Sequence, residues 1–119
     1  MTEHDGIDRK ALDNLAESVG GDREFMAELL TSFLDDAPVQ LEEMRTALGT
    51  ADSERLRRSA HSLKSNSATF GAIEVSHQCK EVEEMAKAVA WDGVSTRIEY
   101  IAAAYEEVKP VLEAIVRDK

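Results

Sequence analysis

Apolar residues recur at steps of three and four along most of this chain, which is the spacing that places them on one side of an α-helix. Glycine-containing breaks interrupt the pattern four times, at Gly20-Gly21, Gly49, Gly71 and Trp91-Asp92-Gly93. No segment alternates apolar and polar residues with period two for long, as a half-buried strand would. The sequence therefore predicts five helices, over about residues 8–19, 22–49, 50–71, 72–90 and 94–117.

Polar residues at the predicted boundaries suit helix ends. Asp8 and Asp22 are expected N-caps, and either Thr50 or Asp52 is expected to start the third helix. Pro38 lies inside the second predicted helix and should kink it or split it in two, because proline removes one backbone donor. Pro110 should bend the last helix. The expected core positions include Phe25, Met26, Leu29, Leu30, Phe33 and Leu34 in the second helix, and Val75, Cys79, Val82, Ala86 and Val89 in the fourth.

Short connections between long amphipathic helices make sequential helices antiparallel. We therefore expect an all-α fold, an antiparallel up-down-up-down four-helix bundle with a short additional N-terminal helix packed on one end. A chain of 119 residues can bury one core, so residues 1–119 are expected to form a single domain.

Charge narrows the classes of function. The formal net charge of −10 argues against nucleic-acid binding, which needs a basic face. The one basic patch spans residues 51–70, with Arg55, Arg57, Arg58 and Lys64 against two carboxylates. No apolar run approaches the ~20 residues of a membrane span. The first residues, Met1 to Gly6, look like a loose end without a leader pattern, and His4 within them is expected to be inert, so we expect a cytoplasmic protein.

His61 is the candidate reactive residue. At helical spacing it lies on the side opposite the core stripe, near the cations Arg57 and Lys64 and the small side chains of Ser65 and Ala68. A lone surface histidine is more often inert than functional, but this combination suits a phosphate acceptor. The cations favour the neutral, nucleophilic ring, and after transfer they face a phosphoryl group.

The residues around His61 also carry a resemblance to a known family. They form the run Ala60-His61-Ser62-Leu63-Lys64-Ser65, followed by Ser67 and Gly71-Ala72. This run resembles the signature of histidine-containing phosphotransfer (HPt) domains, and the similarity extends over roughly residues 22–90. The family usually has glycine directly after the lysine, where this chain has Ser65.

The resemblance implies that His61 is phosphorylated and exchanges its phosphoryl group with an aspartate of a response-regulator receiver domain, without kinase activity. It implies a receiver domain and a hybrid or sensor histidine kinase as partners. We expect a monomer with no cofactor of its own, with Mg²⁺ bound by the receiver. Lys64 is expected to stabilise the transition state. Arg57 and Arg58 are expected to speed the encounter with the acidic pocket of the receiver domain. Residues 38–44 are expected to lie in the surface on which the receiver docks.

A count of helical rise from the turn at Gly71-Ala72 places residues 81–83 of the next helix level with His61. Glu83 is the expected partner of the ring Nδ1, fixing the tautomer that leaves Nε2 as nucleophile. Glu81, on the other flank, is the weaker candidate. The alternative is that Glu83 only pairs with Lys87, four residues on.

Two other functions stay open. The chain could be an adaptor of the same fold that docks on a receiver or kinase without carrying phosphate, for which Ser65 is the clue. It could also be a metal-binding or hydrolytic bundle, supported by a single Glu-x-x-His motif at Glu74 to His77 with Glu81 nearby. Di-metal bundles aim two such motifs at the interior, which disfavours this interpretation.

Overall fold

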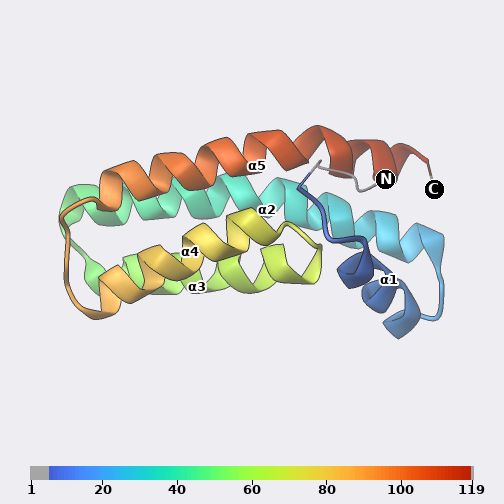
Figure 1. Cartoon of the computed structure of the whole chain (residues 1–119), viewed down its shortest axis with the longest axis horizontal. Coiled ribbons are helices and arrows are strands. Elements are labelled where there is room, and N and C mark those ends of the chain that lie inside the picture. The colour runs from blue at the N-terminus through green and yellow to red at the C-terminus, as the bar shows by residue number, and fades with distance from the viewer. Residues whose placement is uncertain (1–5, 119) are drawn as a thin grey trace.

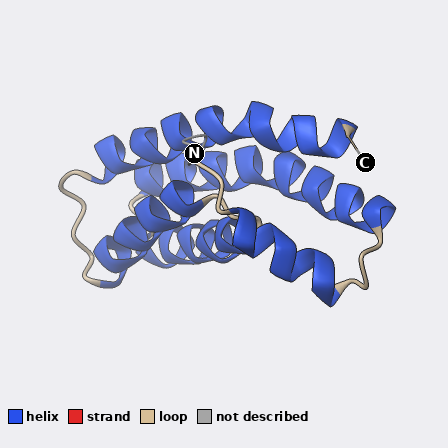
Figure 2. Cartoon of the chain, turned by 45° about the vertical axis from the view of Figure 1, so that its right-hand side comes forward, coloured by secondary structure: helices blue, strands red, loops and turns tan. Residues whose placement is uncertain are grey.

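A computed structural model describes residues 6–118 of the chain, so the expected loose end, apart from Gly6, and His4 lie outside the described residues. Its five helices are α1 (Arg9–Ser18), α2 (Arg23–Thr50), α3 (Ser53–Thr69), α4 (Ile73–Lys87) and α5 (Val94–Arg117). No strand occurs in the described part of the chain (Figure 2), which has only one isolated antiparallel bridge, between Ile7 and Ala72. The expected all-α fold is confirmed.

Three aspartates begin helices. The side chains of Asp8, Asp22 and Asp52 accept hydrogen bonds from the backbone N–H groups of residues 10, 25 and 55, at 3.1, 3.0 and 3.0 Å. Each bond satisfies a donor that the first helical turn leaves free. The third helix therefore starts after Asp52 and not at Thr50.

The fourth helix ends three residues before the expected position. The Ala90 N–H bonds back to Met85 O at 2.9 Å, and Val89 adopts a φ of +52°, so the chain reverses after Lys87. Val89 is 59% exposed, and its expected place in the core is wrong. Phe25, in the first turn of α2, is likewise 44% exposed, so its expected place in the core is also wrong.

The four long helices lie side by side, each running opposite to the one before it (Figure 1). Helix α2 packs against α3 and α5, and α4 packs against the same two helices. Their apolar stripes meet in one core, which includes Leu30, Phe33, Met44, Leu56, Leu63, Val82, Ile98 and Ile101. We call the part of the molecule where all four run together the four-helix section.

Helix α1 packs where the shorter α3–α4 hairpin has ended (Figure 1), in contact with α2 and α3. The backbone fixes this docking, since the Asp8 N–H donates to Gly71 O at 2.8 Å. Gly71 has a φ of +80°, and a Cβ atom there would lie 2.5 Å from the Asp8 carbonyl oxygen. Only glycine allows this approach.

Helix α2 continues through Pro38 without a break, so the expected alternative of a split helix is wrong. Pro38 cannot donate to the carbonyl of Leu34, four residues before it. The Tyr105 hydroxyl, from α5, donates to that carbonyl at 3.0 Å instead. The Tyr105 ring meets Phe33 edge to face, and Phe33 stacks on Phe70, which together close one end of the four-helix section.

Candidate functional site

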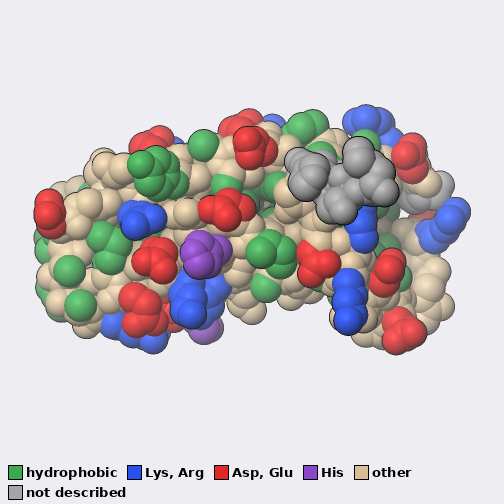
Figure 3. All heavy atoms as spheres, viewed as in Figure 1, with side chains coloured by type: hydrophobic (Ala, Val, Ile, Leu, Met, Phe, Trp, Pro, Cys, Tyr) green, Lys and Arg blue, Asp and Glu red, His purple; other side chains and the backbone are tan. Residues whose placement is uncertain are grey.

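His61 lies in the middle of α3 with its side chain 57% exposed. Histidine side chains reach the surface over α3 and α4 among Lys, Arg, Asp and Glu (Figure 3). The residues one turn and two turns along the same face, Ser65 and Ala68, are small and exposed. The ring is therefore open to a partner of the size of a protein domain, as expected.

Glu83 holds the ring from the neighbouring helix. Its side chain, on α4, is only 4% exposed, and its Oε2 lies 2.9 Å from Nδ1 of His61. The contact expected from helical rise is thus present, whereas Lys87 lies 3.5 Å from Glu84 instead. With Nδ1–H donating to the carboxylate, the second ring nitrogen, Nε2, keeps its lone pair.

Lys64 completes the cluster. Its Nζ lies 2.6 Å from Glu83 Oε1, and its side chain is 30% exposed. Burial by itself raises the pKa of Glu83, but hydrogen bonds and charge from Lys64 and His61 outweigh burial and hold that pKa below its ordinary value. Glu83 is therefore an ionised carboxylate at neutral pH, enclosed by protein and shared by two basic groups.

The α3–α4 hairpin sets this geometry. Leu63 and Val82 point into the core, which leaves their neighbours Lys64 and Glu83 at the seam between the helices. The Ser76 hydroxyl donates to Lys64 O at 3.0 Å and ties the two helices together one turn further on. The tight turn through Gly71 then fixes the register that brings residue 83 beside residue 61.

The basic patch is not a set of free cations. Arg57 bonds to Glu54 through Nε at 3.2 Å, Arg58 lies 3.8 Å from the same carboxylate, and Arg55 pairs with Glu43 on α2 at 2.8 Å. Arg57 and Lys64, the two cations that the sequence places near His61, are therefore both paired with carboxylates in this structure. The i, i+3 spacing of Glu54 and Arg57 was a signal for the first pair, but the pairing of Lys64 needed the tertiary structure.

The alternative metal site has no support in the geometry. Glu74 accepts a hydrogen bond from Gln78 at 2.7 Å, and His77 is exposed on α4. The described residues contain no group of three or more His, Cys, Asp or Glu side chains arranged to hold a metal ion. Burial raises the pKa of Cys79 to about 12, so its thiol is not a nucleophile at neutral pH.

A family model for the Hpt domain matches residues 28–110, which include His61, Lys64 and Glu83. The chain belongs to the Hpt domain family. HPt domains are phosphocarriers and not kinases, and this supports a phosphotransfer role in two-component signalling. Within the described residues, no helix is long and apolar enough to cross a membrane.

Solved structures show the same fold. The chain resembles the histidine-containing phosphotransfer protein HptB from Pseudomonas aeruginosa PAO1, with a TM-score of 0.89 and 26% identity, covering 98% of this chain and 99% of that one. It shares the fold of the HPT domain of the Hpt sensor hybrid histidine kinase from Shewanella, with a TM-score of 0.72 and 20% identity, covering 90% and 92%. A search among curated proteins finds no match.

Proposed function

We propose that residues 1–119 form one HPt domain, an antiparallel up-down-up-down four-helix bundle with α1 on one end, that carries a phosphoryl group on His61. It exchanges this group with an aspartate of a receiver domain, as a cytoplasmic monomer in a multistep phosphorelay. The observation that supports the proposal best is the exposed imidazole whose Nδ1 lies 2.9 Å from the buried carboxylate of Glu83. Such a ring presents Nε2 to solvent as the nucleophile.

In the proposed reaction, the Nε2 lone pair attacks the phosphorus of the receiver's aspartyl phosphate. The P–N bond forms as the P–O bond breaks, and the electron pair of that bond returns to the aspartate carboxylate. Positive charge develops on the ring, and the adjacent Glu83 carboxylate stabilises it. The reverse reaction follows the same path, and the Mg²⁺ that it needs is held by the receiver.

The ammonium group of Lys64 takes two positions in the proposed reaction, one before and one after the transfer. In the unphosphorylated chain its ammonium lies 2.6 Å from Glu83. Its four-carbon stem lets it turn toward a phosphoryl group on His61, one turn away, as a point charge. Lys64 therefore stabilises the transition state and the product, and Glu83 keeps its bond to His61 while the ammonium moves.

The docking surface includes the part of α2 level with His61. The pair between Arg55 and Glu43 sets the register of α2 against α3, and by helical rise it places residues 37 and 38 level with His61. The receiver covers this region and the expected segment 38–44, together with Ser65 and Ala68. Arg57 and Arg58 lie on the same helix and steer the acidic pocket of the receiver toward it.

Incubation with a radiolabelled, phosphorylated receiver domain tests the proposal. The chain should acquire an acid-labile, alkali-stable phosphate, His61→Gln should abolish it, and the matched variant His77→Gln should leave it unchanged. Lys64→Ala should slow transfer by about one to two orders of magnitude, the scale of one lost electrostatic donor. Labelling that survives in His61→Gln contradicts the assignment. Binding of the receiver without any labelling would favour the adaptor function.

A further inference from the structure

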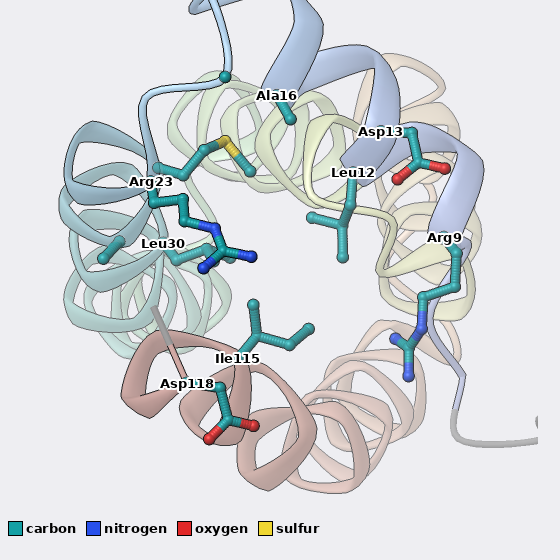
Figure 4. A pocket seen from close by; sticks show the side chains of 11 residues that line it. Arg9, Leu12, Asp13, Ala16, Arg23, Leu30, Ile115 and Asp118 are labelled. Carbon is teal, nitrogen blue, oxygen red and sulfur yellow. The ribbon is translucent and has the colours of Figure 1, made fainter.

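A cavity of about 490 Å³ lies at the end of the molecule that α3 and α4 do not reach. Of the helices in the described part of the chain, α1, residues 23–30 of α2 and residues 112–117 of α5 lie here, and we call this part the three-helix end. Helix α1 contacts α2 and α3 but not α5 in the described structure, so the space between α1 and α5 stays open. Figure 4 shows Leu12 of α1 facing Ile115 of α5 across this space.

The floor of the cavity is apolar. It is lined by Leu12, Leu30, Met26 and Ile115, with the small side chains of Ala16 and Ala27 between them. Such side chains offer water no hydrogen-bond partners, so water there is readily displaced by an apolar group. The volume falls in the range of ~300–1,000 Å³ that is typical of small-molecule sites.

The mouth of the cavity carries charge. The Arg23 guanidinium extends from α2 toward the opening, and Arg9, Asp13 and Asp118 lie around it (Figure 4). Arg23, Asp13 and Asp118 form no ion pair with any side chain among residues 6–118. An arginine over an apolar floor binds an anionic head with an apolar tail, and the two carboxylates at the rim favour a head with a single negative charge over a dianion such as a phosphate ester, which they repel about twice as strongly.

We propose that this cavity binds a medium-chain carboxylate, with the carboxylate on Arg23 and the alkyl chain between Leu12, Leu30 and Ile115. The site is separate from His61, because none of the residues that line the cavity belongs to α3 or α4. Binding of a ligand to the cavity can therefore be measured without phosphotransfer. If no ligand binds there, the proposed phosphotransfer function of His61 is unaffected.

The test is an NMR titration of the ¹⁵N-labelled full chain with sodium octanoate. The expected result is saturable amide shifts in residues 9–30 and 112–118, with the amides around His61 unmoved. Two further probes share the alkyl chain, 1-octanol and octylamine. The alcohol should bind more weakly than the carboxylate, and the amine more weakly still. Shifts that do not saturate, or octylamine binding as tightly as octanoate, would overturn the proposal.

Variants of the chain test the contributions of the ligand's carboxylate and of its alkyl chain separately. Arg23→Gln should weaken octanoate binding about tenfold, the scale of one charge-assisted contact, and leave 1-octanol binding unchanged. Lys80→Gln, an exposed lysine on α4 far from the cavity, is the matched control and should change neither. Ala16→Phe should fill the cavity and abolish both. If Ala16→Phe does not fold, the surface variant Arg23→Gln still tests the proposal. Octanoate binding to Arg23→Gln with the same affinity as to the parent chain would contradict it.

Discussion

The four-helix section and the three-helix end are built from the same two long helices, α2 and α5, but they are packed differently. In the four-helix section, α3 and α4 fill the space beside them so completely that even the ionised Glu83 is buried with both oxygens close to a basic group. At the three-helix end, the ten-residue α1 takes the place of two helices, and a cavity of about 490 Å³ remains.

This difference bears on the position of the proposed phosphorylation site at His61. A ring that presents Nε2 in one orientation, as proposed for His61, needs a rigid neighbour, and two packed helices tied by a tight turn supply one. A cavity forms where the packing is incomplete, as it is at the three-helix end, where one helix takes the place of two. Two pairs of variants test this contrast, and two more compare a buried with an exposed side chain on one helix. They are taken from the largest expected effect to the smallest.

The first pair compares two leucines. Leu63→Ala should lower the free energy of unfolding by about 4 kcal/mol, because Leu63 is fully buried in the four-helix section and its loss opens a new void. Leu12→Ala should cost only about 2 kcal/mol, because Leu12 already faces the cavity and has fewer contacts to lose. Urea denaturation measures both. Equal losses would mean that the two regions are packed alike.

The second pair compares two glycines with positive φ at the junction and beyond it. Gly71→Ala should cost about 3 kcal/mol, because a methyl group there meets the Asp8 carbonyl as well as an unfavourable backbone conformation. Gly20→Ala should cost about 1 kcal/mol, since its methyl group meets nothing within 4 Å. Amide exchange of Asp8 should quicken only in the Gly71 variant. An unchanged Asp8 amide in that variant would show that α1 docks without this contact.

The third pair compares two glutamates on α4. Glu83→Gln should cost about 2 kcal/mol at neutral pH, since the buried carboxylate is lost beside Lys64 and His61. Glu84→Gln, whose carboxylate is exposed and reaches only Lys87 at 3.5 Å, should cost close to nothing. Glu83→Gln should also slow labelling by phosphorylated receiver, and the ¹⁵N shifts of the imidazole should show a mixture of tautomers.

The Glu83 effect has a definite pH dependence. The pKa of Glu83 is lowered in the folded chain, so unfolding takes up protons. The stability that the carboxylate contributes is complete above the ordinary glutamate pKa of about 4.3 and is lost as the pH falls through the lower, folded value. The stability gap between the parent chain and Glu83→Gln should close over that acidic range. A gap that is independent of pH would contradict the ion pair.

The last pair compares two tyrosines on α5. Tyr105→Phe should cost about 1 kcal/mol, because the Leu34 carbonyl that Pro38 leaves without its helical donor then loses the Tyr105 hydroxyl as well. Tyr100→Phe, at an exposed position, should change the free energy of unfolding very little. Thermal denaturation of the three chains measures the difference. Equal stability of the two variants would mean that water satisfies the Leu34 carbonyl.

Local signals in the sequence were sufficient for the helices and for the candidate reactive residue. The caps Asp8 and Asp22 act within three residues, and apolar spacing in a helix is a local property, so both could be predicted from the sequence. For the third helix the sequence left Thr50 and Asp52 as alternatives, and the structure shows Asp52. The exposure of His61 followed from the same spacing. The level of Glu83 followed from helical rise counted from one glycine turn.

Contacts between helices could be decided only by the tertiary structure. Burial of Phe25 and Val89 depended on whether another helix covered them, which periodicity does not encode. The flank of α4 that faces His61, and the commitment of Lys64 to Glu83, depended on the handedness and tilt of packed helices. The donor that bonds to the Leu34 carbonyl in place of Pro38 is the Tyr105 hydroxyl, 71 positions from Leu34 along the chain. The cavity exists because α1 does not reach α5, and no single segment of sequence records the distance between two helices.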